Sequence, residues 1–199
     1  MNPLNSQWFY RGLKQKLKEQ LPTEKAEKIW QEAGKEYAEI LSLDAELKKH
    51  KGAMVLPAVV LYRVLEKNGE DAEKILNAYG DHMGEKFAGI VHGITSLPGV
   101  SRLLWKHMDS MMDRMSSEKL GYQRELVSGA DGMLGVDILS CPYHELAKQL
   151  GNEKAVRCIC HMDKRYSQGF HAIRYERNSS VGEGDKMCAY RLRFDHSKK

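Results

Sequence analysis

The sequence lacks the features that mark several large classes of protein. Its longest apolar run, from Ala53 to Tyr62, is much shorter than the roughly 18 residues of a membrane span. The segment from Met1 to Tyr10 has no basic region followed by an apolar stretch, as a secretory signal would. We therefore expect a soluble, cytoplasmic protein with no membrane partner.

An excess of charge of one sign is also missing. The 31 Lys and Arg residues are nearly balanced by 27 Asp and Glu residues, so the formal net charge is only +4 over 199 residues. Nucleic-acid-binding domains carry a clear basic excess that clusters on one face. Hydrophobic residues make up 42% of the chain, which is typical of a folded globular protein. The composition thus predicts a globular protein that does not bind nucleic acid.

Cysteine is absent from the first 140 residues, and all four cysteines follow: Cys141, Cys158, Cys160 and Cys188. Without a secretory signal, reduced thiols, a metal site or a reactive cysteine are favoured over two disulfides. Whatever thiol chemistry the protein has therefore belongs to its C-terminal part.

The first 120 residues have the periodicity of helices. From Thr23, a candidate N-cap, apolar residues recur at helical spacing as far as Leu41. The segment 53–67 is apolar almost all round, which is typical of a helix buried on most sides. Further helices are expected over 70–87 and 100–115. On the last of these, four methionines share one face: Met108, Met111, Met112 and Met115. This face favours a flexible core or dimer seam, and the alternative is an adaptable wall of a ligand pocket.

After residue 120 the period changes to that of strands. Strands are expected over 122–128 and 133–140, joined by a turn at 129–132, and again over 170–177 and 187–194. Helices over 142–150 and 153–166 lie between the two pairs. The sequence predicts an α+β fold in which a helical part, 1–120, packs with an antiparallel sheet of about four strands and short helices, 121–199, as one compact unit. The helical half could also form a homodimer.

Alternation in the last two strands places Arg177 and Cys188 on the face that also carries the apolar residues. An inward arginine needs an anion as its partner. The anion is either a protein carboxylate or a substrate carboxylate, and the pattern does not decide between them.

Three of the cysteines are placed where they could converge with an aspartate. Cys160 and Asp163 are three residues apart on an expected helix and share a face, whereas Cys158 points elsewhere. Cys141 precedes a helix that starts at Pro142, where the helix dipole favours a thiolate. In order of preference, the cysteines are small buried residues, or one is a nucleophile, or they bind a metal. Cys158, Cys160 and His161 are plausible metal ligands, but the chain has no Cys-x-x-Cys pair.

An ordered set of motifs runs through the second half of the chain. It comprises Val136–Tyr143 with its terminal Cys-Pro-Tyr, Leu150-Gly151-Asn152-Glu153, Cys160-His161-Met162-Asp163, Tyr175-Glu176-Arg177, and Gly184 with Cys188. Upstream, Leu56–Arg63 and Leu97-Pro98-Gly99 belong to the same set. Together these motifs resemble the L-2-amino-thiazoline-4-carboxylic acid hydrolase-like family, from about Gly52 to Phe194.

The resemblance implies a bacterial hydrolase that opens a cyclic isothiourea at a C–N or C–S bond. Cys141 is the preferred nucleophile because of its helix-start position, with Cys160 second and Asp163 as the acid or base. Arg177 would hold the substrate carboxylate, with Tyr143 and Cys188 as further substrate contacts.

Two alternatives accompany that mechanism. A divalent metal held by Cys141, Cys160, Cys188 and Asp163 could instead supply the attacking water. The competing function is a non-catalytic small-molecule-binding or sensor domain that uses the same pocket.

Overall fold

The computed structural model describes residues 2–129 and 131–198. Within them the chain forms seven α-helices and a four-stranded antiparallel sheet, which confirms the predicted α+β class. The elements are α1 (Leu13–Gln20), α2 (Thr23–Leu43), α3 (Gly52–Lys67), α4 (Ala72–Thr95), α5 (Val100–Met115), β1 (Gln123–Ser128), β2 (Leu134–Ser140), α6 (Pro142–Gln149), α7 (Arg157–Ser167), β3 (Ile173–Arg177) and β4 (Cys188–Phe194). Short 3-10 turns are η1 (Pro3–Ser6), η2 (Ala45–Lys48), η3 (Glu118–Leu120), η4 (Glu153–Val156) and η5 (Val181–Glu183). Ala130, in the predicted turn between β1 and β2, lies outside the described residues.

The chain divides into two compact units. The first comprises Met1–Gly80 and Tyr143–Ile159, and the second comprises Asp81–Pro142 and Cys160–Lys199. Helices α4 and α7 therefore contribute residues to both units. The expected division at residue 120, which follows secondary-structure type, stays a prediction.

The core of the first unit is built on α2 and α3. The predicted stripe of α2 is buried, with Trp30 fully inaccessible, and its indole N–H donates to Asn5 Oδ1 at 3.0 Å. Helix α3 is buried on nearly every side, as its uniform apolarity predicts. Pro57 lies inside this helix, past its first turn, where proline removes one backbone hydrogen bond.

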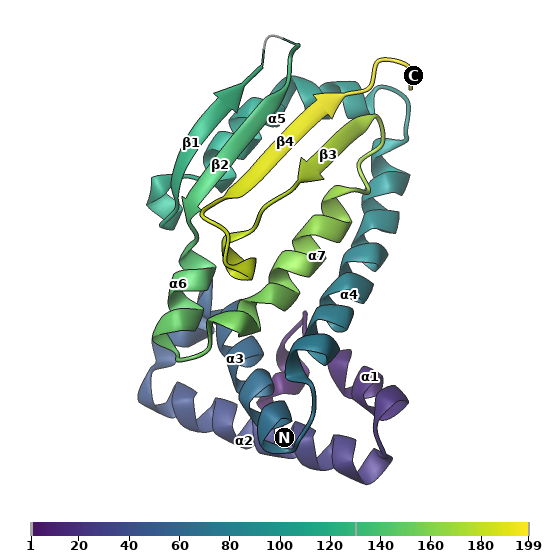
Figure 1. Cartoon of the computed structure of the whole chain (residues 1–199). Coiled ribbons are helices and arrows are strands. Elements are labelled where there is room, and N and C mark those ends of the chain that lie inside the picture. Colours follow the sequence, from purple (N-terminus) through teal and green to yellow (C-terminus); the bar gives the residue numbers. More distant parts are fainter. Residues whose placement is uncertain (1, 130, 199) are drawn as a thin grey trace. The chain divides into compact units, whose positions relative to one another are not determined.

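The sheet belongs to the second unit, and its strands follow the order β1-β2-β4-β3 (Figure 1). Along β3 and β4 the register sets Arg177 opposite Tyr190 and Tyr175 opposite Leu192. Between β2 and β4 it sets Ile138 opposite Cys188. Because side chains alternate along a strand, one face of this sheet carries the buried residues and the inward arginine together.

Helix α5 packs on the buried face of the sheet. Its Met108 joins Ile173, Tyr175 and Leu192 in one apolar cluster, and Met112 packs against that cluster. Helix α4 is longer than the predicted 70–87 and continues to Thr95. The Thr95 hydroxyl accepts a hydrogen bond from the His171 backbone N–H at 2.9 Å, a tertiary contact that local sequence does not reveal.

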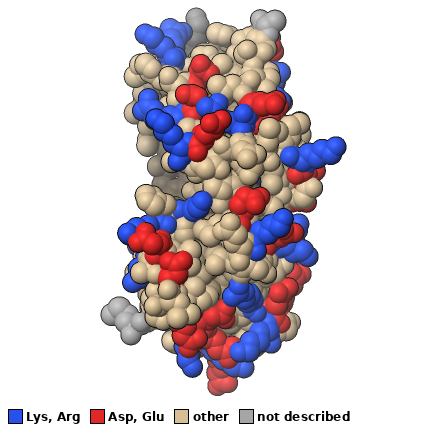
Figure 2. Space-filling view, turned by 90° about the vertical axis from the view of Figure 1, so that its left-hand side faces the viewer, with Lys and Arg blue, Asp and Glu red and all other residues tan. Residues whose placement is uncertain are grey.

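The distribution of charged side chains and the character of the helices can be compared with what the composition predicts. Figure 2 shows acidic and basic side chains interspersed on the face that it displays, in keeping with the balanced charge of the sequence. None of the helices in residues 2–129 and 131–198 combines the length and apolar character that crossing a membrane requires.

Candidate functional site

The polar centre of the second unit is the guanidinium of Arg177, at the end of β3. Only 3% of this side chain is exposed. One terminal nitrogen donates to Asp163 Oδ2 at 2.9 Å and to the Tyr190 hydroxyl at 3.2 Å, and the other donates to the Cys160 carbonyl at 2.8 Å. A buried charge is tolerated only when it is paired and hydrogen-bonded. The structure thus gives Arg177 a protein carboxylate as its anion.

Tyr190 completes this arrangement from β4. Its hydroxyl donates to Asp163 Oδ2 at 3.1 Å, and the Arg177 guanidinium carbon lies 5.5 Å from its ring centroid. The ring-centroid distance is within the range of a cation–π contact. Because Tyr190 is the cross-strand partner of Arg177, the register of the hairpin brings these two side chains to the same carboxylate.

Asp163 extends from α7 and keeps 29% of its side chain exposed. Burial raises the pKa of this carboxyl above its usual value, while the charge of Arg177 and the hydrogen bond from Tyr190 lower it and partly offset that effect. Both hydrogen bonds end on Oδ2. Among the residues that the structure describes, the other oxygen, Oδ1, has no hydrogen-bond partner, so it can meet a ligand.

Cys141, Cys160 and Cys188 lie near this carboxylate. Burial raises the pKa of the Cys160 thiol, and the nearby Cys141, Cys188 and Asp163 raise it further, while Arg177 lowers it. These electrostatic interactions put Cys141, Cys188 and Asp163 in the neighbourhood of the Cys160 thiol, and the catalytic roles predicted for the set stay predictions. Cys160 is therefore a protonated thiol near neutral pH.

The other two thiols of the set differ in burial. Cys188 is only 5% exposed, its Sγ accepts a hydrogen bond from the Val181 backbone N–H at 3.2 Å, and burial raises its pKa. Cys141 is half-buried and packs against the cluster that contains Cys188. It directly precedes Pro142, the first residue of α6, as predicted.

Cys158 and Tyr143 belong to the first unit. The Cys158 thiol is buried, donates to the Ala155 carbonyl at 3.3 Å, and burial raises its pKa to about 12. It is thus an inert core thiol. Tyr143 is half-buried. Its substrate contact, like those of Arg177 and Cys188, stays a prediction.

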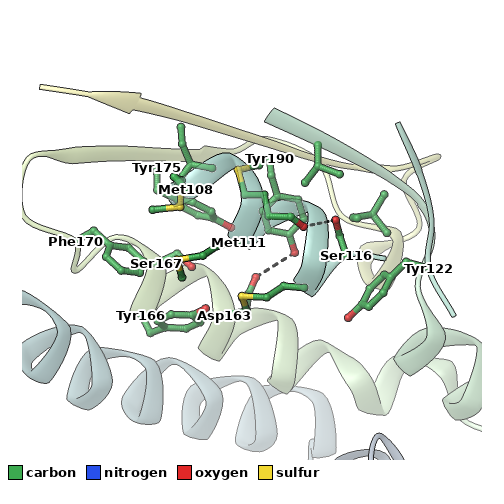
Figure 3. Close-up of a pocket in the computed structure, with 15 residues that line it drawn as sticks. Met108, Met111, Ser116, Tyr122, Asp163, Tyr166, Ser167, Phe170, Tyr175 and Tyr190 are labelled. Carbon is green, nitrogen blue, oxygen red and sulfur yellow. Dashed lines mark hydrogen bonds between the residues drawn. The ribbon is translucent and has the colours of Figure 1, made fainter. Parts of the chain in front are cut away.

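A cavity of about 270 Å³ opens beside Asp163. It is lined by Met108, Met111, Met112, Met115, Ser116, Tyr122, Val136, Ile138, Asp163, Tyr166, Ser167, Phe170, Tyr175, Tyr190 and Leu192. Figure 3 shows Tyr175 and Tyr190 reaching from the strands toward Asp163 and Tyr166 on α7. All four methionines of α5 face this cavity. Their shared face therefore forms part of the core, the interpretation favoured from the sequence, and also one wall of a cavity, as the alternative interpretation predicts.

One polar atom of the cavity wall stands out. The Tyr175 hydroxyl is buried and has no hydrogen-bond partner within the described part of the chain. Buried polar groups are nearly always satisfied, and an exception calls for an explanation. Alternation along the last two strands puts Tyr175 and Tyr190 on the same face as Arg177 and Cys188, but they were not identified as functional residues from the sequence. Their proximity to Asp163, on a different element, carries no local sequence signal.

The donor set does not fit a metal ion. Within residues 2–129 and 131–198, no group of three or more His, Cys, Asp or Glu side chains is placed to hold one. The carboxylate of Asp163 is bonded to Arg177, and the Cys160 and Cys188 thiols have raised pKa values. A metal on the predicted ligands would have to displace these protons and bonds.

Comparison with known proteins gives one family and a set of distant structures. A family model described as L-2-amino-thiazoline-4-carboxylic acid hydrolase matches residues 48–192. No curated protein matches the chain. Among solved structures, an H-NOX protein from S. oneidensis in the Fe(II)NO ligation state is 10% identical, with 98% of this chain and 99% of that chain covered and a TM-score of 0.41. The NMR structure of an H-NOX domain from Shewanella oneidensis in the Fe(II)CO ligation state is 9% identical over 98% and 99%, with a TM-score of 0.38. We draw nothing about function from likenesses this distant.

Proposed function

This chain belongs to the L-2-amino-thiazoline-4-carboxylic acid hydrolase family, and from that premise we propose that it opens a small cyclic amidine or isothiourea, such as 2-aminothiazoline-4-carboxylate, by hydrolysis of a ring C–N or C–S bond. The observation that carries the proposal is the carboxyl of Asp163. It is held by Arg177 and Tyr190, has a raised pKa and borders a cavity of ligand size. A carboxyl whose pKa is raised in this way is suited to act as both an acid and a base.

The reaction needs one water and one proton relay. The water oxygen bonds to the ring carbon between nitrogen and sulfur as Asp163 accepts its proton. The tetrahedral adduct then collapses and breaks the ring C–N or C–S bond, and Asp163 returns the proton to the departing atom. The net change is the addition of one water across one ring bond. The same carboxyl serves both steps, since it accepts the proton of the water as a base and then donates it to the departing atom as an acid.

In this scheme Arg177 and Tyr190 are positioning residues. Both bond to Oδ2 of Asp163, which fixes the carboxylate and leaves Oδ1 to face the substrate. The hydrogen bonds described for the Arg177 guanidinium all end on protein groups. We therefore propose that Arg177 positions Asp163 and does not bind the substrate carboxylate directly.

Cys141 offers a competing route. Its sulfur could attack the same ring carbon, with ring opening followed by hydrolysis of the enzyme-bound adduct. Cys160 suits this role less well because burial raises the pKa of its thiol. The residues lining the cavity include Asp163 but none of the cysteines of the described chain. This favours the water route.

Turnover tests the proposal. The purified protein is incubated with 2-aminothiazoline-4-carboxylate and with 2-amino-2-thiazoline, with and without divalent metal, and the ring-opened product is measured by mass spectrometry. We expect Asp163→Asn to abolish turnover and Cys141→Ser to keep most of it. Cys158→Ala, which removes a thiol in the first unit, is the matched control. Failure of all these rings to open would sink the hydrolase proposal, and loss of activity in Cys141→Ser with the fold intact would establish the thiol route.

A second candidate is a ligand-binding domain without catalysis. The largely apolar cavity and the protonated Cys160 and Cys188 thiols favour it. Saturable binding of these rings without any product would support this function over hydrolysis.

A further inference from the structure

We propose that the Tyr175 hydroxyl binds the carboxylate of the substrate. This inference rests on the proposed function, in which the substrate is a five-membered ring that carries both an amidine and a carboxylate. Tyr175 takes the contact predicted for Arg177 from the sequence, because the described hydrogen bonds of that guanidinium all end on protein groups. The cavity thus recognises an anion through a neutral donor.

The charge of the cavity wall is the first observation. None of the described residues that line the cavity is a lysine, an arginine or a histidine. The carboxylate among them, Asp163, is paired with Arg177 at 2.9 Å, so the pair as a whole carries no net charge. A ligand carboxylate that leaves water for such a cavity needs hydrogen-bond donors in place of its hydration. Neutral donors of the wall therefore have to supply them.

The second observation is which donors of the wall are still available. All side-chain donors among the described lining residues are hydroxyls of serine and tyrosine. A hydroxyl has a single proton to donate. Ser116 donates to the Met112 carbonyl at 2.6 Å, and Tyr190 donates to Asp163 at 3.1 Å. The Tyr175 hydroxyl, by contrast, is buried and has no hydrogen-bond partner in the described part of the chain.

The surroundings of the Tyr175 hydroxyl suit it to this role. Burial raises the pKa of Tyr175, and the charge of Asp163 raises it further while Arg177 lowers it, so the hydroxyl keeps its proton and acts as a donor. Met108 packs against this tyrosine in the core cluster. Because methionine side chains rearrange readily, Met108 can shift as a ligand enters and give its carboxylate access to the hydroxyl.

The position of Tyr175 fits the size of the substrate. In 2-aminothiazoline-4-carboxylate, a single ring nitrogen separates the carbon that water attacks from the carbon that bears the carboxylate. The group that binds the carboxylate must therefore lie close to Asp163, the base of the proposed reaction. Tyr175 interacts electrostatically with Asp163, and Figure 3 shows it reaching toward Asp163 across the same cavity.

Two aromatic analogues test the inference, 2-aminothiazole-4-carboxylate and 2-aminothiazole, because their rings resist opening and binding is measured without turnover. Isothermal titration calorimetry gives the affinity of each for the full chain and for Tyr175→Phe. We expect the parent to bind the carboxylate at least about tenfold more tightly than the plain ring, the lower end for a hydrogen bond to a charged group. Tyr175→Phe should lose this preference and keep its affinity for 2-aminothiazole.

Tyr166→Phe is the matched control. It removes a hydroxyl from another ring of the cavity wall, but one that interacts with Ser167, and it should keep the preference for the carboxylate. A parent protein without that preference overturns the inference. So does a Tyr175→Phe variant that keeps the preference, or one that loses affinity for both rings alike.

Turnover distinguishes this inference from the proposed function. If the parent opens 2-aminothiazoline-4-carboxylate and Tyr175→Phe does so with the same KM, the role of Tyr175 is refuted and the hydrolase proposal stands. If the carboxylate preference depends on Tyr175 but no ring is opened, hydrolysis is refuted and the binding role stands.

Discussion

The two tyrosines that face Asp163 differ in one testable respect. The Tyr190 hydroxyl donates to Asp163 at 3.1 Å and accepts from Arg177 at 3.2 Å. Hydrogen bonds to charged groups contribute about 1.5 to 3 kcal/mol each. Because the two bonds share one hydroxyl and the ion pair survives its loss, we expect Tyr190→Phe to lower the free energy of unfolding by about 2 to 3 kcal/mol.

Tyr175→Phe is the matched comparison. It removes the same atom from a neighbouring ring, but this hydroxyl has no hydrogen-bond partner in the described protein. Its free energy of unfolding should therefore stay within about 0.5 kcal/mol of the parent, or rise. Urea unfolding followed by far-UV circular dichroism measures both values. An equal loss in the two variants would refute the reasoning, because it would mean that the bonds of Tyr190 to the ion pair stabilise the fold no more than the Tyr175 hydroxyl, which has no partner in the described protein.

Three other predictions concern acidity, packing and thiol reactivity. Burial raises the pKa of Asp163, so folding favours the protonated carboxyl. The protonated carboxyl therefore stabilises the fold at a pH below the ordinary carboxyl pKa, and this stabilisation is lost as the pH rises through the raised pKa of the folded state. As the catalytic base it must be ionised, so kcat/KM should begin to fall, as pH is lowered, at a higher pH than an ordinary carboxyl sets; a profile flat across that range contradicts the role. Gly84→Ala should destabilise the folded protein by about 1 to 3 kcal/mol, because the new Cβ would lie 2.6 Å from the Met162 carbonyl oxygen. Gly89→Ala, on the same helix, meets nothing within 4 Å and should stabilise the folded protein by about 0.5 to 1 kcal/mol. Thermal denaturation that finds Gly84→Ala the more stable of the two would contradict this prediction. Iodoacetamide near pH 8 should modify Cys141 before Cys158 and Cys188, because Cys141 is half-buried whereas the other two are buried and burial raises the pKa of both of their thiols; peptide mapping that finds either of them labelled faster would count against it.

Much of the fold follows from periodicity that is legible in the sequence. The helix from Thr23, the buried helix of 53–67 and the helix of 100–115 each appear as predicted, because burial of a continuous stripe or of a whole run leaves a local signal. The extension of α4 to Thr95 was missed, and at its end the Thr95 hydroxyl accepts a hydrogen bond from the backbone N–H of the distant residue His171. The predicted helix of 153–166 begins as the 3-10 turn η4, and its α-helical part starts at Arg157.

The sequence predicted which residues belong to the candidate site better than it predicted which of them contact one another. Alternation placed Arg177 inward, and helical spacing put Cys160 and Asp163 on one face. Neither pattern could say whether the arginine meets a protein or a ligand anion, because the distance from β3 to α7 is set by packing. The same limit applies to Tyr190, whose role arises from its cross-strand register with Arg177.

The polar centre also has a consequence for how the chain folds. Its hydrogen bonds join residues only 13 to 27 positions apart, from Cys160 to Tyr190. Pairing of β2 with β4, by contrast, joins Asp137 with Ala189 across a much longer loop. Contacts of low sequence separation close small loops and cost little chain entropy. The segment that holds Asp163 in place therefore closes only short loops, whereas the methionine wall of the cavity comes from α5, a more distant part of the sequence.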